Sequence, residues 1–174
     1  MSRFSWNTIP VLTTSRLRLR ALEKSDQDAL FQIYGDPEVM QFASDPAFPN
    51  ISYIEQMLAS INTLFEQHQS VEWGITLKDA NQVIGTCGFH SFTPDTQAAE
   101  IGCLLRRLYW GQGLMHEALS TLIPWGLERF GLDTLYADID EPNLRSRKLF
   151  QRLGFQLDQE HSLLLTLKRA DWKQ

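Results

Sequence analysis

The sequence predicts a single α/β (α+β) domain over residues 1–174, with about four helices around a mixed, mostly antiparallel sheet. The first supporting observation is a hairpin pattern at 72–89, where two β-type runs flank a short turn. The second is the order strand, glycine loop, helix, strand and helix between 99 and 155. The third is size, because 174 residues, 43% of them hydrophobic and 21% charged, suit one globular domain.

The first part of the chain predicts one strand and two helices, with an exposed loop between the helices. Charged residues alternate with leucine at 16–20, which is the period of a half-buried strand. Ser25 is expected to cap the first helix. The apolar face of this helix consists of Ala29, Leu30, Ile33 and Tyr34. The proline-containing stretch 44–50 cannot continue a helix. In the second helix the apolar stripe consists of Ile51, Ile54, Leu58, Ile61 and Phe65.

The middle of the chain predicts three strands. The runs 72–77 and 83–89 form the hairpin around a turn at 79–81. Pro94 and Asp95 then turn the chain into a third strand at 99–106.

The last third predicts two helices separated by a strand. The first helix begins near Gly113 and ends at Gly131, a residue suited to the left-handed position after a helix. A strand follows at 134–140, and Asn143 starts the last helix. The chain ends in a predicted antiparallel pair of strands, at 155–159 and 162–167.

A glycine loop, Gly111-Gln112-Gly113, precedes the longer of these helices. Glycines allow positive φ angles and let a ligand approach the backbone closely. The first four N–H groups of a helix have no partner inside it, and the helix dipole adds roughly half a positive charge there. Anions therefore bind at such helix ends. The pattern predicts either a tight turn or a phosphate site.

Two common phosphate-binding motifs are excluded by the neighbouring residues. A Walker loop needs a Lys-Ser/Thr pair after its second glycine, where this chain has Leu114 and Met115. A dinucleotide fingerprint needs a third glycine, where this chain has His116. Neither a P-loop kinase nor a dehydrogenase fits this loop.

Several segments in order resemble the GNAT superfamily, the acyl-CoA-dependent N-acetyltransferases. That family carries Gln/Arg-x-x-Gly-x-Gly/Ala before a helix, and later an Asn-led helix that ends in Gly-Phe. The matching residues here are Trp110, Gly111, Gln112, Gly113, Leu114 and Met115. Trp110 replaces the usual Gln or Arg, and Met115 replaces the small residue. The run 109–119 is similar to the Rim-type branch, which includes ribosomal-protein N-terminal acetyltransferases. Further segments that agree with this branch are 14–20, 36–39 and 100–102.

The resemblance implies acetyl-CoA as acyl donor and CoA as the released cofactor. The pyrophosphate would be bound by the backbone N–H groups of Gly111, Gln112, Gly113, Leu114 and Met115. The resemblance also implies that the strands at 99–106 and 134–140 splay apart around the pantetheine arm. A bulge is expected at Gly102, and the N–H of Leu104 is expected to face the thioester oxygen. The arginines at 106–107 either meet phosphates or end the strand in solvent.

Three side chains are candidates for the chemistry and for contacts with CoA. Glu100 is the candidate base, acting through a water, and is otherwise a surface carboxylate. Many relatives place a tyrosine acid where this chain has Phe150, so Ser146 becomes the candidate proton donor to the leaving thiolate. Ser146 could instead hydrogen-bond the pantetheine or its own helix turn. Asn143 is implied as a contact to the pantetheine amide and is equally suited as a helix N-cap.

The expected acceptor is a primary amine. An α-amino group with a pKa near 7.8 is roughly 14% neutral at pH 7, whereas a lysine near 10.4 is roughly 0.04% neutral. A single carboxylate base therefore favours a protein N-terminus. A small-molecule amine or antibiotic acetyltransferase remains an alternative, as does a non-catalytic acyl-CoA-binding module. Phe48 and Tyr53 are expected to line the acceptor wall, which the family builds from its first two helices.

The composition limits which binding partners and which cellular compartment we expect for this protein. The net charge of −5 argues against nucleic acid as a ligand. No apolar run reaches the ~18 residues of a membrane span, and residues 1–4 lack a signal-peptide core. Cys87 and Cys103 lack C-x-x-C spacing and are expected to be reduced. The histidines show no metal-ligand spacing, so no metal site is expected. We expect a cytoplasmic monomer or homodimer that does not bind membranes.

Overall fold

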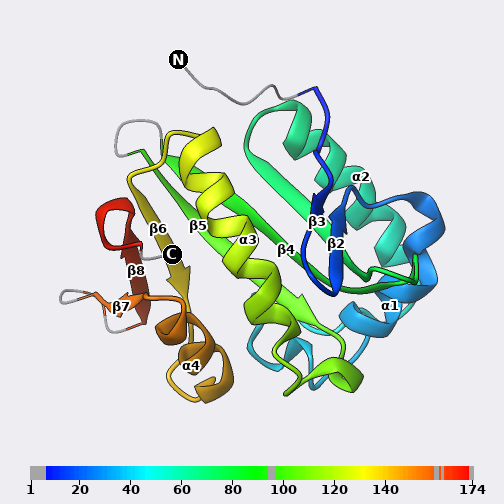
Figure 1. Ribbon diagram of the computed structural model, residues 1–174. Helices are drawn as coiled ribbons and strands as arrows, with labels where there is room; N and C mark the ends of the chain where they lie inside the picture. Colours follow the sequence, from blue (N-terminus) through cyan, green and yellow to red (C-terminus); the bar gives the residue numbers. More distant parts are fainter. Residues whose placement is uncertain (1–6, 94–96, 159–160, 162, 173–174) are drawn as a thin grey trace.

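A sheet of eight strands runs through the computed structural model, which describes residues 7–93, 97–158, 161 and 163–172 (Figure 1). In chain order the strands are β1 (Leu12–Thr13), β2 (Leu17–Arg20), β3 (Ser70–Leu77), β4 (Val83–Thr93), β5 (Ala98–Leu105), β6 (Thr134–Asp138), β7 (Gln156–Leu157) and β8 (Leu164–Lys168). Their order across the sheet is β1-β2-β3-β4-β5-β6-β8-β7. β5 and β6 are parallel, and the other neighbouring pairs among these strands are antiparallel. The predicted mixed, mostly antiparallel sheet is confirmed.

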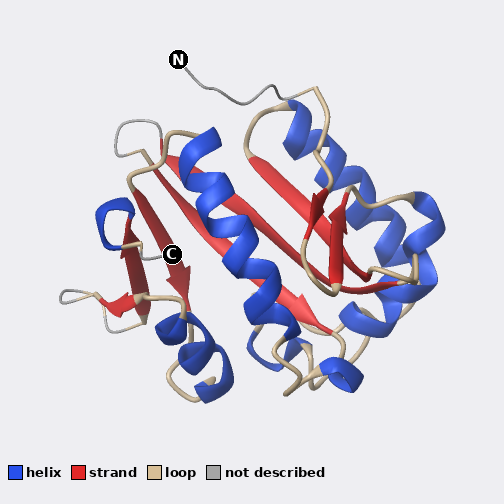
Figure 2. Cartoon of the chain, viewed as in Figure 1, coloured by secondary structure: helices blue, strands red, loops and turns tan. Residues whose placement is uncertain are grey.

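Four α-helices in the described chain pack against this sheet (Figure 2). They are α1 (Gln27–Tyr34), α2 (Ser52–Glu66), α3 (Leu114–Arg129) and α4 (Leu144–Arg152). Figure 1 shows α3 lying across the central strands, with α4 beside the end of β6. Gly131 follows α3 with a φ of 71°, as its predicted left-handed position requires.

The alternation of side chains along the strands divides the hydrophobic core between the two faces of the sheet. Trp73 and Ile75 of β3 belong to the cluster that α3 covers. Leu30 of α1, Ile54 of α2 and Val83 of β4 belong to a second cluster. We call these two sides of the sheet the α3 face and the α1 face.

The start of α1 differs from the prediction. Ser25 lies inside a 3-10 turn (Lys24–Asp26), and its hydroxyl donates to Glu23 at 3.2 Å instead of capping α1. Glu23 and Asp26 form a capping box around this turn. Arg20 donates two 2.8 Å hydrogen bonds to the buried carboxylate of Asp26. A carboxylate can accept from the backbone and from a guanidinium at once, which a single hydroxyl oxygen does less well.

The remaining boundaries follow the predicted order of elements. The hairpin is β3 and β4, and the strands expected at 99–106 and 134–140 are β5 and β6. β7 and β8 form the final antiparallel pair. The turn expected at 94–95, and residues 159 and 162 of the final pair, lie outside the described residues. Both cysteines are free thiols. Within the described residues, the structure has no helix with the length and apolarity needed to cross a membrane.

Candidate active site

β5 and β6 pair along only part of their length. The parallel register joins Ala98, Ala99 and Glu100 of β5 to Thr134, Leu135 and Tyr136 of β6. The register ends there, although β5 continues to Leu105 and β6 to Asp138. The sheet therefore opens beyond Glu100, which confirms the expected splay of these two strands.

A cavity of about 490 Å³ lies at this opening. Residues 101–105 of β5, the start of α3, α4, and the segment after β6 line it. Glu38 and residues 42–44, from the connection between α1 and α2, line it as well. Because α3 and α4 pack on one face of the sheet and this connection follows α1 on the other, the cavity joins both faces through the gap.

The glycine loop meets the cavity at the start of α3. Gly111 and Gly113 each have a φ of 73°, the left-handed region that glycine adopts without strain. Both glycines, Leu114 and Met115 line the cavity. The N-terminal end of α3, with its unpaired N–H groups, is thus directed at this space. Gln112 does not line the cavity, and its side-chain amide donates to a backbone carbonyl of the preceding turn at 2.9 Å.

Hydrogen bonds between the segment that precedes β2 and the first turn of α3 hold this loop in place. Glu117, in the first turn of α3, accepts hydrogen bonds from the Thr14 hydroxyl at 2.5 Å and from Nε of Arg16 at 2.6 Å. Arg16 also donates from Nη1 to the carbonyl of Gln112 at 3.0 Å. Burial acts against the charged carboxylate, but the hydrogen bonds from Thr14 and Arg16 outweigh it and lower the pKa of Glu117. We call these contacts of Glu117 with Thr14 and Arg16 the clamp, and the sequence did not predict it.

Asn143 and Ser146 stand together at the start of α4. The side-chain oxygen of Asn143 accepts from the backbone N–H of Ser146 at 3.2 Å, so Asn143 is the helix N-cap. Both residues also line the cavity. Phe150 is buried and packs edge-on against Phe155, with ring centroids 5.0 Å apart. Ser146 is therefore the hydroxyl that this helix brings to the cavity.

Three cations of α4 border the same space. Arg145, Lys148 and Arg152 line the cavity, and their spacing of three and four residues places them on one side of the helix. The guanidinium carbon of Arg145 lies 3.3 Å from the centroid of the Trp110 ring. The arginines at 106–107 are absent from the cavity lining, and Arg107 forms ion pairs of 2.6 and 2.9 Å with the α1–α2 connection. The cations that border the cavity are thus those of α4, and the arginines at 106–107 lie outside its lining.

The β4–β5 ladder corrects the prediction for Gly102. The register is continuous from Gly85 paired with Leu105 to His90 paired with Glu100. Gly102 sits inside this regular stretch, directly opposite Gly88. The irregularity lies instead between His90 and Thr93.

The same register places the N–H of Leu104 on the side of β4, and not on the expected side of the gap. Arg106 donates its N–H to the carbonyl of Ile84 on β4 at 2.9 Å. Residues that bond across an antiparallel ladder alternate with residues that face outward, so the N–H of Leu104 also points toward β4. The outward N–H groups are those of Cys103 and Leu105, on the side of the gap. Leu104 itself remains part of the cavity lining.

The α1 face of the sheet carries two carboxylates beside a pair of glycines. Glu72, Gly88 and Gly102 lie in one row across β3, β4 and β5. Burial raises the pKa of Glu72 to about 7, although a hydrogen bond from Thr86 opposes the shift. Glu100 lines the cavity in the neighbouring row, opposite a histidine that the sequence analysis did not select.

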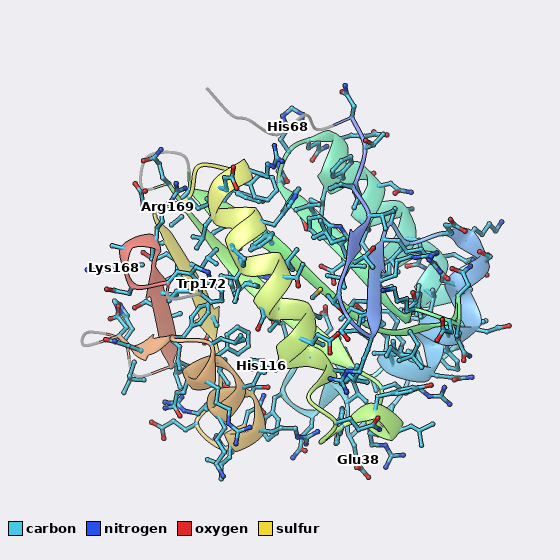
Figure 3. All side chains as sticks on the ribbon, viewed as in Figure 1. Glu38, His68, His116, Lys168, Arg169 and Trp172 are labelled. Carbon is cyan, nitrogen blue, oxygen red and sulfur yellow. The ribbon has the colours of Figure 1, made fainter. Side chains whose placement is uncertain are left out.

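The α1–α2 connection forms the outer wall of the cavity. Phe42 and Ala43 line it, whereas the expected Phe48 and Tyr53 do not. Phe48 instead stacks on a tyrosine of α1, with ring centroids 5.5 Å apart. Figure 3 shows Glu38 near the turn that precedes α3, and His116 on the side of α3 toward α4. In the described residues no group of three or more His, Cys, Asp or Glu side chains has the geometry of a metal site.

Comparisons with known proteins agree with this geometry. A family model described as an acetyltransferase (GNAT) domain matches residues 16–156. The uncharacterized N-acetyltransferase p20 of Bacillus licheniformis is 37% identical over 145 residues, covering 83% of this chain and 82% of the relative.

Two solved structures show the likeness of fold. RimL, a ribosomal L7/L12 α-N-protein acetyltransferase in complex with coenzyme A, has a TM-score of 0.80 at 20% identity. The match covers 91% of this chain and 98% of that chain. A ribosomal-protein-S5-alanine acetyltransferase from Vibrio fischeri has a TM-score of 0.78 at 18% identity, covering 95% of this chain and 100% of that chain.

Proposed function

This chain belongs to the GNAT acetyltransferase family, and on that premise we propose that it transfers the acetyl group of acetyl-CoA to a primary amine. The favoured acceptor is the α-amino group of a protein N-terminus. One observation carries the proposal: a single cavity joins the N-terminus of α3, through the gap between β5 and β6, to carboxylates on the α1 face.

The residues at the α3 end of the cavity fit CoA. The left-handed glycines leave main-chain N–H groups free for the pyrophosphate. The cations Arg145, Lys148 and Arg152 match the negative charge of the phosphates. Asn143 borders the gap, where the pantetheine arm would lie. When bound, acetyl-CoA supplies an acyl group activated as a thioester.

The residues of the gap supply the electrostatics of direct transfer. The outward N–H groups of Cys103 and Leu105 would donate to the acyl oxygen. Glu100 supplies negative charge at the acceptor end, which favours removal of a proton from the amine. Ser146 would donate a proton to the leaving sulfur. Burial raises the pKa of the Cys103 thiol to about 12, so this cysteine stays protonated and is unsuited to carry the acyl group.

Three considerations support an α-amine acceptor. Deprotonation at pH 7 costs roughly 1 kcal/mol for an α-amine and about 4.6 kcal/mol for lysine, so the weak base of this cavity suffices for the first. RimL and the Vibrio fischeri protein, which share the fold, are described as acting on ribosomal proteins. The Glu100 carboxylate in the cavity lining, with the net charge of −5, suits a positively charged N-terminus.

The test is release of free CoA from acetyl-CoA with a panel of N-terminal peptides, polyamines and aminoglycosides. We expect the highest kcat/KM with an N-terminal peptide. Glu100→Gln should lower turnover while calorimetric binding of CoA stays unchanged. Binding without turnover on every acceptor would identify a non-catalytic acyl-CoA-binding module. The absence of CoA binding would exclude both functions.

A further inference from the structure

We propose that His90 of β4 is the catalytic residue that takes the proton from the acceptor amine, and that Glu100 is its positioning residue. This inference rests on the proposed acetyl transfer and assigns its proton acceptor. His90 is not part of a recognisable sequence motif. The pairing of β4 with β5 is what brings it opposite Glu100.

The two side chains share one end of the cavity. His90 and Glu100 are direct partners in the β4–β5 register, so their side chains leave the same face of the sheet. Nδ1 of His90 lies 3.6 Å from Oε2 of Glu100. Both residues line the cavity, with 39% of the His90 side chain and 32% of the Glu100 side chain exposed. Catalytic hydrogen bonds of this kind are often long and shorten when substrate binds.

The contacts of the imidazole select its tautomer. Nδ1 faces the Glu100 carboxylate and also lies 3.1 Å from the hydroxyl of Ser91. A carboxylate accepts hydrogen bonds and cannot donate one when ionised, so it favours the proton on Nδ1. The lone pair is then on Nε2, the nitrogen that a base must present to its substrate.

Nε2 points into space that a glycine leaves open. A Cβ atom on Gly102 would lie 3.3 Å from Nε2, and the only other atom near that position is Cδ2 of the same ring, at 3.9 Å. Gly102 lines the cavity and is followed along β5 by Cys103, whose outward N–H is a proposed donor to the acyl oxygen. A nitrogen above Gly102 would therefore contact both His90 and the reacting acyl group.

The backbone directly after His90 departs from regular strand geometry. The β4–β5 register shifts directly after His90, between it and Thr93. Ser91 has a φ of 53°, an unusual conformation for a residue other than glycine. Residues in such conformations concentrate at functional sites. Here the strained residue places its own hydroxyl against Nδ1 of His90.

Other charged groups around His90 come from several elements. The carboxylates on its side of the cavity or of the sheet are Glu100 of β5, Glu38 of the α1–α2 connection, Asp138 of β6 and Glu72 of β3. The cationic and imidazole groups that line the same cavity are Arg145, Lys148 and Arg152 of α4 and His116 of α3. Glu100 is the carboxylate with a contact to the ring, at 3.6 Å from Nδ1.

Each proton that moves during acyl transfer can be followed from donor to acceptor. The acceptor arrives as an ammonium ion and gives one proton to Nε2 of His90. The nitrogen–carbon bond then forms as the carbon–sulfur bond breaks. The leaving sulfur takes a proton from the Ser146 hydroxyl, and Ser146 regains one, through water, from the protonated nitrogen of the new amide. His90 releases its proton to solvent before the next turnover.

The test compares His90→Gln and Glu100→Gln with wild type across pH 5.5–9, using acetyl-CoA and an N-terminal peptide. His90→Gln should lower kcat by about 100-fold and abolish the acidic limb of the pH profile, because imidazole is the side chain that titrates in this range. Glu100→Gln should lower kcat by about 10-fold and leave the acidic limb in place, because the ring loses the carboxylate that orients it. CoA affinity and thermal unfolding should stay near wild type in both variants. Addition of imidazole to His90→Gly should restore part of the lost activity.

A second measurement does not depend on turnover. The ¹⁵N chemical shifts of the His90 ring in the folded protein should show the Nδ1–H tautomer, and Glu100→Gln should reduce its population. A ring protonated mainly at Nε2 overturns the inference, as does a fully active His90→Gln or one that is slower with an unchanged acidic limb. If one of these contrary results is obtained while the wild type acetylates an acceptor, acetyl transfer stands and only the role of His90 falls. A wild type inactive on every acceptor overturns the proposed function and this inference with it.

Discussion

The two edges of β5 differ in how far they are paired with the neighbouring strands. Toward β4, the strand is paired from Glu100 to Leu105 without a break in register. Toward β6, pairing covers Ala98 to Glu100 and then stops. The first side satisfies the backbone groups of every second residue within the sheet, and the second leaves the N–H groups of the intervening residues, Cys103 and Leu105, facing the gap. One strand thus carries both a stabilising ladder and a ligand-binding edge.

The difference shows how an open sheet can remain stable. Unpaired backbone groups are costly when buried, so they persist where a ligand or water takes the place of the missing strand. The ladder with β4 fixes the direction of every outward N–H, because bonding residues alternate along an antiparallel strand. The gap can therefore present donors at set positions without a mobile loop.

The largest expected effect comes from breaking the paired side. Gly88→Ala would place a Cβ against the carbonyl oxygen of Val71 and the carboxylate of Glu72. Because one of these atoms is backbone and cannot move freely, the cost should reach about 3 kcal/mol. Thermal unfolding should show a Tm lower by about 6–12 °C. A Tm within about 2 °C of wild type would mean that this row of the ladder is not tightly packed.

The matched change at the register partner on β5 should spare the fold and lower activity. Gly102 is the register partner of Gly88, but a Cβ there meets only the His90 ring, at 3.3 Å. Gly102→Ala should change stability by less than about 1 kcal/mol and lower kcat/KM by about 10- to 100-fold. Calorimetric binding of CoA serves as the control and should be nearly unchanged. Full activity in Gly102→Ala would show that the acceptor does not use this space.

The smallest expected effect is a pH dependence of stability on the paired side. Burial raises the pKa of Glu72 to about 7, so the folded state binds this proton more tightly than the unfolded state. The contribution of Glu72 to stability is complete below its unfolded pKa of about 4.5 and is lost as the pH rises through about 7. Thermal unfolding at pH 6 and pH 8 should therefore show a decline in Tm. Glu72→Gln, which retains the shape but does not ionise, should reduce that decline by about 1–2 °C. A decline of equal size in Glu72→Gln would assign it to other groups.

Several parts of the site could be predicted because their determinants are local. Gly111 and Gly113 adopt the left-handed conformation that brackets the start of α3. Asn143 caps α4 through a bond to the third residue after it, a contact that depends on a few neighbouring dihedral angles. The row Arg145, Lys148 and Arg152 could also have been found, because its spacing follows the helical period.

Other parts depend on contacts between distant segments. The clamp between Arg16 and Glu117 joins residues 101 positions apart. The Ser25 prediction was wrong because a buried ion pair between Arg20 and Asp26 determines how α1 begins. Neither contact has a signature in the residues around it.

By itself, the sequence determined the kind and order of the elements and the glycine loop at the start of α3. Hydrophobic periodicity, glycine and helix caps act over a few residues, so they can be recognised in one dimension. Only the tertiary structure decided which N–H groups face the gap and that His90 meets Glu100. Both depend on the cross-strand register, and a shift of one residue would turn every side chain of β5 to the other face.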